Sequence, residues 1–321
     1  MKWVLFPLFL VLVSCGQHKS LPPPALKPDY RVSDFKGSVA FSEVERFLTS
    51  GSGVAGSPAA SKAADYLVGR LRELGVQATI DEFSEATPAG NKAFRNVVGI
   101  IPGNKDRIVI LGAHYDLKSG VDSFVGANDS GSGVGLLLAM APVLESVSAV
   151  GGAEVWLVFL DGEECFVSYG QNDGLHGSRH LAKKLVAEGG VAKVQAFILV
   201  DMIGDKDLTV TIPRNSDPAL MAAVFKAATE AGKRSFFSLC EYSILDDHQP
   251  FLDKGIPAID LIDFQYGSAP RLNDYWHTAN DTLDKLSANS LETIGQVILR
   301  MLNGLTPVTP ADSGSPTQES F

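Results

Sequence analysis

Hydrophobic residues recur along this chain with two alternating periods, one typical of helices and one typical of strands. Apolar positions three and four residues apart predict helices, whereas short apolar or alternating runs predict strands. The helical pattern covers residues 41–48, 59–74, 133–147, 180–187, 218–231 and 287–302, and the strand pattern covers 76–83, 94–101, 107–111, 155–160, 196–203 and 258–262. This alternation predicts an α/β fold: a single domain with a central mixed, mostly parallel β-sheet flanked by helices.

The two ends of the chain depart from this pattern. Lys2 and the apolar run after it predict a secretory signal peptide, and the run is shorter than a membrane-spanning helix usually is. Residues 12–16 resemble a bacterial lipobox, which implies lipidation of Cys15; a plain signal peptide with an incidental cysteine is the alternative. We expect a lipoprotein signal peptide over 1–14, a flexible tether over 15–36, the folded domain over 37–305 and a disordered tail over 306–321.

Composition limits the partners of the protein. The 321 residues carry a net charge of −10, and they show no cluster of Lys and Arg that would favour nucleic acid. Cys165 and Cys240 are too few for a disulfide framework, and whether they pair is left open. We expect a monomer that is lipid-anchored in a bacterial cell envelope. Gly16 favours the periplasmic face of the outer membrane, because it is not the Asp that often retains lipoproteins in the inner membrane.

Acidic or histidine residues follow several of the apolar runs. They are His114 and Asp116 after 107–111, Glu163 and Glu164 after 155–160, Asp201 after 196–200, and His277 beyond 258–262. In an open α/β sheet the carboxyl ends of the strands meet at one edge, where ligands bind. Singly, these residues have simpler explanations, and Asp129, for example, could cap the next helix. Together, carboxylates and imidazoles at one edge predict a site for a zinc-type cation.

These motifs resemble the zinc-dependent M28-type peptidases, and within them the glutaminyl cyclases, over residues 54–302. The peptidase pattern is carried by Gly56-Ser57-Pro58, His114-Tyr115-Asp116, Gly126-Ala127-Asn128-Asp129, Glu163-Glu164, Asp201 and His277. Three features are similar to the cyclases in particular: the long loop after Glu164, the extra Asp246 before Asp247-His248, and Trp276 directly before His277. Two positions depart from the animal cyclases, since Asp260 replaces a histidine and Leu245 replaces a glutamine.

The resemblance implies a zinc aminopeptidase-like α/β sandwich with the activity of a glutaminyl-peptide cyclotransferase. Such an enzyme converts the N-terminal glutamine of peptides or proteins to pyroglutamate and releases ammonia. The resemblance implies one Zn²⁺ per chain, held by Asp129, Glu164 and His277. The other implied roles are general acid/base for Glu163 with Asp246 and Asp201 beside it, substrate contact for Trp276 and Tyr169, and a second metal or a supporting position for His114 and Asp116.

Two other functions stay open at this point. In a two-zinc aminopeptidase, His114, Asp129 and Asp201 would hold a second metal while Glu163 deprotonates a water. The ligands alone do not exclude that enzyme, but the long loop, Asp246 and Trp276 favour the cyclase. A lipid-anchored protein that captures peptide N termini without turnover is the third hypothesis. Loss of Glu163 or of a zinc ligand would favour it, and none is lost.

Overall fold

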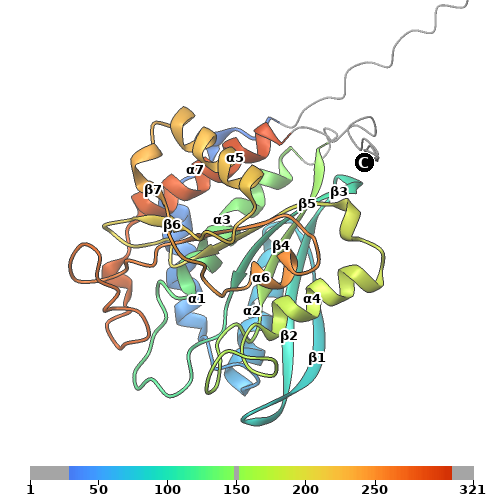
Figure 1. Cartoon of the computed structure of the whole chain (residues 1–321), viewed down its shortest axis with the longest axis vertical. Helices are drawn as coiled ribbons and strands as arrows, with labels where there is room; N and C mark the ends of the chain where they lie inside the picture. Colours follow the sequence, from blue (N-terminus) through green and yellow to red (C-terminus); the bar gives the residue numbers. More distant parts are fainter. Residues whose placement is uncertain (1–28, 148–151, 306–321) are drawn as a thin grey trace, which may run out of the picture.

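The computed structural model describes residues 29–147 and 152–305 of the chain. A six-stranded sheet in the order β1-β2-β4-β3-β5-β8 forms its centre (Figure 1). The strands of this sheet are β1 Gln77–Thr87, β2 Gly90–Ile101, β3 Asn104–His114, β4 Ala153–Leu160, β5 Val194–Asp201 and β8 Ala258–Ile262. Strands β3, β4, β5 and β8 pair in parallel, whereas β1, β2 and β4 pair antiparallel. The predicted mixed, mostly parallel sheet is confirmed.

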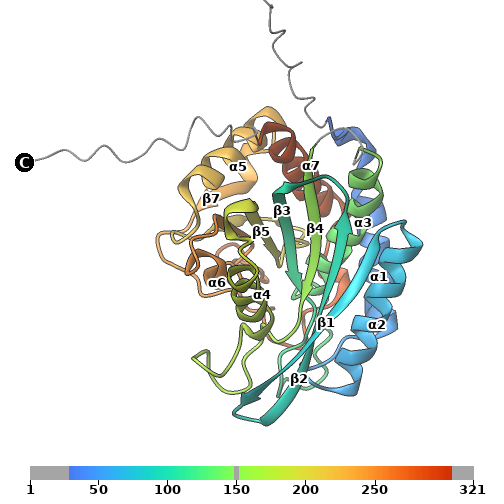
Figure 2. The ribbon, with the colours of Figure 1, turned by 90° about the vertical axis from the view of Figure 1, so that its right-hand side faces the viewer.

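Helices cover both faces of this sheet. They are α1 Gly37–Ser50, α2 Pro58–Glu73, α3 Gly131–Glu145, α4 His176–Ala187, α5 Pro218–Glu230, α6 Gln249–Leu252 and α7 Ala288–Gly304. Helices α1, α2 and α3 lie on one face, and α4 and α6 lie on the other (Figure 2). Helices α5 and α7 add apolar residues to the core of the first face. The protein is therefore a three-layer α/β sandwich, as the sequence predicts.

The predicted elements are all present, and most extend beyond the predicted range at one end or both. Four of them end earlier than predicted: α2 at Glu73 instead of 74, α3 at Glu145 instead of 147, β5 at Asp201 instead of 203 and α5 at Glu230 instead of 231. Strand β8 has the predicted bounds, and Asp217 caps α5 by accepting hydrogen bonds from the N–H groups of Ala219 and Leu220 at 2.9 and 3.0 Å. The short helix α6 was not predicted, and neither was the two-stranded sheet of β6 Val210–Ile212 and β7 Phe237–Leu239. These elements are too short to give a periodic signal.

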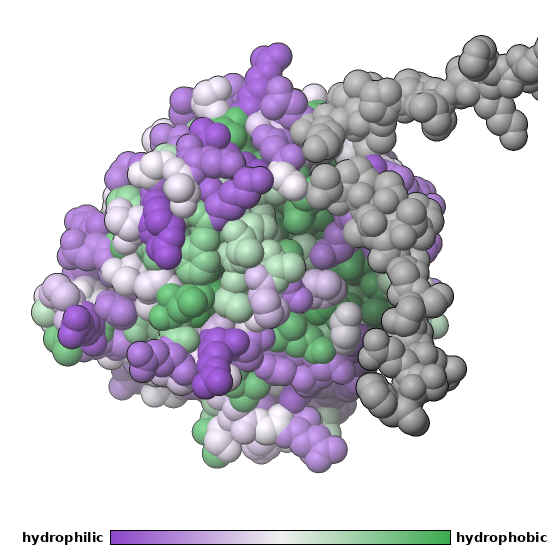
Figure 3. Space-filling view, turned by 45° about the horizontal axis from the view of Figure 1, so that its top comes forward, coloured by the Kyte–Doolittle hydropathy of each residue, from purple (hydrophilic) through white to green (hydrophobic). Residues whose placement is uncertain are grey.

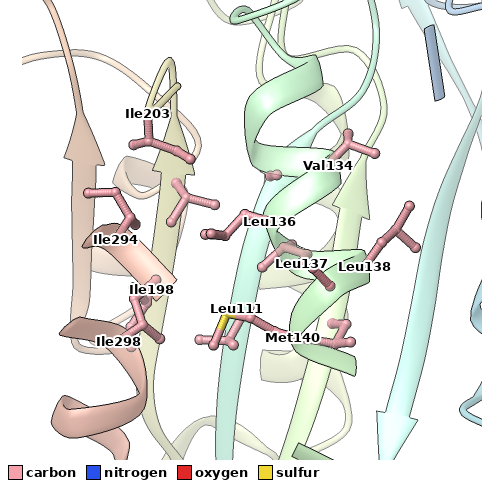
Figure 4. Close-up of a cluster of buried hydrophobic side chains, with 14 of the residues drawn as sticks. Leu111, Val134, Leu136, Leu137, Leu138, Met140, Ile198, Ile203, Ile294 and Ile298 are labelled. Carbon is pink, nitrogen blue, oxygen red and sulfur yellow. The ribbon is translucent and has the colours of Figure 1, made fainter. Parts of the chain in front are cut away.

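Helix α3 lies in the centre of the core. Its predominantly apolar side chains pack between the sheet and α1, and Met140 lies beside Leu111 of β3 (Figure 4). Burial of such side chains contributes about 1.5–3 kcal/mol each. Because α3 begins at Gly131, this packing also fixes the position of Asp129, two residues before the helix.

The described chain begins with packed residues. Tyr30 and Phe35, which fall within the expected tether, are buried, and the Tyr30 N–H donates to Asn303 Oδ1 of α7 at 2.8 Å. The expected signal peptide, the lipidation site Cys15 and the expected tail over 306–321 lie outside the described residues. Among the helices described, none is long and apolar enough to cross a membrane.

The face seen when the top of the molecule is turned forward has hydrophobic residues near its middle and hydrophilic residues around them (Figure 3).

Candidate active site

The carboxyl ends of the parallel strands bring the predicted polar residues to one edge of the sheet. His114 ends β3 and pairs in register with Leu160, the last residue of β4, so that Glu163 and Glu164 follow beside it. Asp201 ends β5 and pairs with Ile262 of β8. The loops that follow these strands gather in the lower half of Figure 1. The topology therefore brings these predicted residues to the same edge of the sheet.

Three donor groups converge at this edge from three separate loops. His277 Nε2 lies 2.7 Å from Glu164 Oε1 and 3.3 Å from Asp129 Oδ2, and the three donor atoms lie within 4.8 Å of one another. The side chain of Asp129 does not cap α3, which removes the simpler explanation for that residue. Two carboxylates and one imidazole form a donor set of the kind that binds catalytic zinc with one open position.

The charges of this donor set favour the binding of a cation. Burial disfavours the charged form of His277, yet hydrogen bonds with Asp129 and Glu164 raise its pKa to about 9. Asp129 Oδ2 and Glu164 Oε2 are buried, and each faces a basic group: His277 Nε2 lies 3.3 Å from the first, and Lys118 Nζ lies 3.3 Å from the second. The two carboxylates therefore attract positive charge, and a metal ion can take the place of the proton on His277.

A second donor set lies behind the first and shares Asp129 with it. His114 Nε2 is 3.0 Å from Asp129 Oδ1 and 3.4 Å from Asp201 Oδ1. Asp129 and Asp201 of this set line the pocket, but His114 is only 1% exposed and does not, whereas all three residues of the first set do. An ion in the first set is therefore the one that a substrate in the pocket would reach.

Glu163 lies in the pocket beside the first donor set. The hydroxyl of Tyr169 donates to Glu163 Oε1 at 3.0 Å, so the tyrosine contacts the carboxylate directly. Burial raises the pKa of Glu163 well above its ordinary value, and the charges of Glu164 and Asp246 raise it further. A carboxyl group with such a pKa can accept and return a proton near neutral pH.

Other buried acidic groups adjoin Glu163. Burial raises the pKa of Asp246 well above its ordinary value, with further contributions from Asp201 and Asp247. Burial also raises the pKa of Asp201. It raises the pKa of Asp260 well above its ordinary value. Five carboxyl groups that repel one another in a buried space cannot all be ionised, so at least some of them hold protons that can be exchanged.

Aromatic side chains form one wall of the pocket. The ring of Trp276 stacks on that of His277 at 4.0 Å and meets Phe264 edge-on at 5.2 Å. Trp276 and Phe264 line the pocket with Tyr169, which confirms that both predicted substrate-contact residues face it. These rings limit the access of water to the donor set.

Several supporting residues lie directly behind the site. The carboxylate of Asp116 accepts hydrogen bonds from the backbone N–H groups of Glu163 and Glu164 at 3.1 and 3.2 Å, and it belongs to neither donor set among the described residues. It therefore supports the site by fixing the loop that carries the glutamates. Gly162 makes this loop possible, because its φ is +75° and a Cβ there would meet the ring of Phe94 at 2.5 Å.

Two further supports escaped the sequence analysis. Asp281 accepts hydrogen bonds from the N–H groups of Asn128 and Asp129 at 2.8 and 3.0 Å, and from the hydroxyl of Tyr266 at 2.8 Å. Lys118 lies 3.3 Å from Glu164 Oε2 and 3.0 Å from the sulfur of Cys165. Cys165 and Cys240 are both free thiols and do not pair.

Known proteins share the sequence and the fold of this chain. The model of peptidase family M28 matches residues 96–302. A glutaminyl-peptide cyclotransferase-like protein of Bos taurus is 31% identical over 76% of this chain and 69% of its own length. The crystal structure of an Acidobacteriales bacterium glutaminyl cyclase shares 36% identity, covering 88% of this chain and 98% of that chain with a TM-score of 0.79.

The chain belongs to peptidase family M28 and, within it, to the glutaminyl cyclases. The M28 fold also serves peptidases: a Zn-dependent exopeptidase from Parabacteroides distasonis is 27% identical, with a TM-score of 0.75 over 85% of this chain and 99% of that chain. Within the glutaminyl cyclase family, the match to the bacterial cyclase covers 98% of that structure, so this chain shares nearly all of its fold.

Proposed function

We propose that this protein is a zinc-dependent glutaminyl-peptide cyclotransferase that converts N-terminal glutamine to pyroglutamate and releases ammonia. The observation that carries the proposal is the position of Glu163. This buried carboxyl group with a raised pKa shares one pocket with the Asp129, Glu164 and His277 donor set, with Asp246 and with Trp276. The family membership and the similarity to cyclases support the same reaction.

The chemistry can be assigned to the residues of the pocket. Zinc, when bound, polarises the γ-carboxamide of the substrate. Glu163 accepts a proton from the α-amino group, whose nitrogen then forms a bond to the carbonyl carbon of the γ-carboxamide, Cδ. The bond between Cδ and the amide nitrogen breaks, and Glu163 returns its proton to the leaving ammonia. Because the attack is intramolecular, a pocket that folds the glutamine into a ring-like shape contributes much of the rate.

We propose one zinc per chain, held by Asp129, Glu164 and His277. The support is geometric, since this donor set opens onto the pocket while His114 lies behind it. The Parabacteroides distasonis relative is described as a Zn-dependent exopeptidase, and the donor set here has the residue types that zinc prefers. In this proposal His114 and Asp201 stay without a metal of their own.

The value of kcat/KM is expected to rise with pH, and the apparent pKa of this rise should lie above the ordinary range of a carboxyl group. Glu163 must be deprotonated to accept the proton, and burial with the charges of Glu164 and Asp246 raises its pKa. Asp246→Asn removes one of these charges, so the acidic limb of kcat/KM should move to lower pH as kcat falls. Rate profiles of wild type and variant test this. An acidic limb that stays in place or moves to higher pH would contradict the effect of the Asp246 charge on the pKa of Glu163.

Removal of the support behind Asp129 is expected to weaken the metal site. Asp281→Asn replaces one of the two oxygens that accept from the backbone of Asn128 and Asp129. Zinc affinity should fall about 10- to 100-fold, as for other residues that orient metal ligands. A competition titration with a chelator measures the affinity. Asp284→Asn, at an exposed residue of the same loop, is the control and should bind zinc like the wild type.

Release of ammonia distinguishes the cyclase from the aminopeptidase. Zinc-loaded protein is incubated with one peptide that begins with glutamine and a matched peptide that begins with leucine. The proposal expects ammonia from the glutamine peptide alone and no free amino acid from either. Free leucine would identify a peptidase, and the absence of any product would favour a binding protein.

We also propose that the protein is a monomer, lipid-anchored through Cys15 in a bacterial cell envelope, on the periplasmic face of the outer membrane. The support is the sequence of residues 1–16 alone. Expression of the full chain with Cys15→Ser tests the anchor. The wild type should sediment with membranes, whereas the variant should stay in the soluble fraction.

A further inference from the structure

The loop that joins β4 to α4 carries both Glu163 and Tyr169. It covers residues 161–175 and lies in the lower half of Figure 1. Glu163 is buried near its start, whereas Val167 is 76% exposed and residues 170–172 are exposed as well. A loop with so few buried contacts opens easily unless other bonds hold it.

The carboxylate of Asp173 holds this loop from within. The residue is 4% exposed, and it accepts hydrogen bonds from the backbone N–H groups of Phe166, Val167 and Ser168 at 2.6, 2.8 and 2.9 Å. Burial disfavours the charged form of Asp173, yet these three bonds lower its pKa, so the group is ionised at neutral pH. Hydrogen bonds to an ionised acceptor are about twice as strong as those between neutral groups. One side chain therefore fixes the three residues directly before Tyr169.

Further contacts fix the loop on the other side of Tyr169. The Gly170 N–H donates to the Asp173 carbonyl at 3.0 Å, and the Arg179 side chain of α4 donates to the Gly170 carbonyl at 2.6 Å. Gly174 has a φ of +73°, and a Cβ at this position would meet the ring of Tyr169 at 2.5 Å. The chain is therefore held before and after Tyr169, and the tyrosine ring lies against the backbone of Gly174.

The position of Tyr169 matters because of what its side chain contacts. Its hydroxyl donates to Glu163 Oε1 at 3.0 Å and lies 3.3 Å from Glu163 Oε2, so it orients this carboxyl group. Its ring lines the pocket together with Trp276. Misplacement of such a group by about 1 Å can lower a rate about 100-fold.

We propose that Asp173 is a positioning residue of the reaction, and that it acts by holding Tyr169 against Glu163 and against the substrate. The proposal rests on the proposed function, because Glu163 must be the group that moves the proton. Among the described residues, Asp173 is not one of those that line the pocket or form the two donor sets. Its effect on the reaction is therefore expected to pass through the loop.

A double-mutant cycle of Asp173→Ala and Tyr169→Ala tests this role. With zinc-loaded protein and a glutamine peptide, Asp173→Ala should lower kcat, raise KM and reduce kcat/KM about 10- to 100-fold. In the Tyr169→Ala background the same substitution should cost less than about 3-fold, because the side chain that Asp173 positions is already absent. A protein that is merely less folded would instead lose kcat at unchanged KM.

Two further variants complete the cycle. Asp173→Asn keeps one carboxamide oxygen as an acceptor, so its kcat/KM should lie between those of the wild type and Asp173→Ala. It takes the place of Asp173→Ala in the cycle if that variant does not fold. Asp217→Ala is the matched control, since Asp217 also accepts two backbone N–H groups but caps α5 away from the pocket. Its kcat and KM should stay close to those of the wild type.

The outcomes separate the positioning role from the reaction. Wild-type kcat/KM in Asp173→Ala, or a loss of kcat at unchanged KM, would overturn the role and leave the cyclase intact. Equal losses from Asp173→Ala in the wild-type and Tyr169→Ala backgrounds would also overturn it, because Asp173 would then act independently of Tyr169. Turnover of no glutamine peptide by the wild type would overturn both the proposed function and the role that rests on it.

Discussion

Glu163→Gln is expected to lower kcat for a glutamine peptide by about 10²- to 10⁴-fold while zinc remains bound. The glutamine side chain keeps the shape of the glutamate but can neither accept the proton of the α-amino group nor return it to ammonia. The hydroxyl of Tyr169 still has an oxygen to which it can donate, so the local packing is retained. Steady-state kinetics and the zinc content of the purified variant measure the two halves of this prediction.

Glu154→Gln is the matched control for this substitution. Glu154 is also buried and lies near the opposite end of the same strand, where it accepts a hydrogen bond from Trp156 Nε1 at 2.8 Å. Its replacement should leave kcat close to that of the wild type. If Glu163→Gln retained near wild-type kcat, Glu163 would lose its assigned role as the proton acceptor.

His277→Gln is expected to remove zinc and activity together. His277 supplies the single imidazole of the donor set and lies 2.7 Å from Glu164 Oε1. Without it, two buried carboxylates remain with one neutral amide oxygen, which is a poor ligand for zinc. Elemental analysis should find one zinc per chain in the wild type and little in the variant, and kcat should fall in proportion.

His180→Gln provides the comparison for the loss of an imidazole elsewhere. His180 lies on α4, where it stacks on Phe83 and is 3.3 Å from Asp81 Oδ2, outside both donor sets. Zinc content and kcat should both be retained. Two zinc ions per wild-type chain, with the second one lost in His114→Gln, would instead indicate the dinuclear site of a peptidase.

The position of the site was predictable because it depends on the ends of strands. The apolar runs before His114, Glu163 and Asp201 identify β3, β4 and β5, and parallel strands bring their carboxyl ends together. The helix after Asp129 was predictable for a similar reason, since its continuous apolar sequence indicates a buried element. Such signals are local in the sequence, and the fold follows from them with few alternatives.

The supports of the site were not predictable in the same way. Asp281 meets the backbone of Asp129 across 152 positions of sequence, and no local pattern records that contact. In the sequence, nothing distinguishes Lys118 from an ordinary surface lysine. In the structure, its side chain lies against Glu164 and Cys165.

The most direct test of the central claim is the mass of a glutamine peptide after incubation with the zinc-loaded protein. A peptide that begins with leucine is treated in parallel. The account predicts that the glutamine peptide loses one ammonia and keeps its chain length, while the leucine peptide is unchanged. A glutamine peptide of unchanged mass, or one shortened by its first residue, would contradict the account.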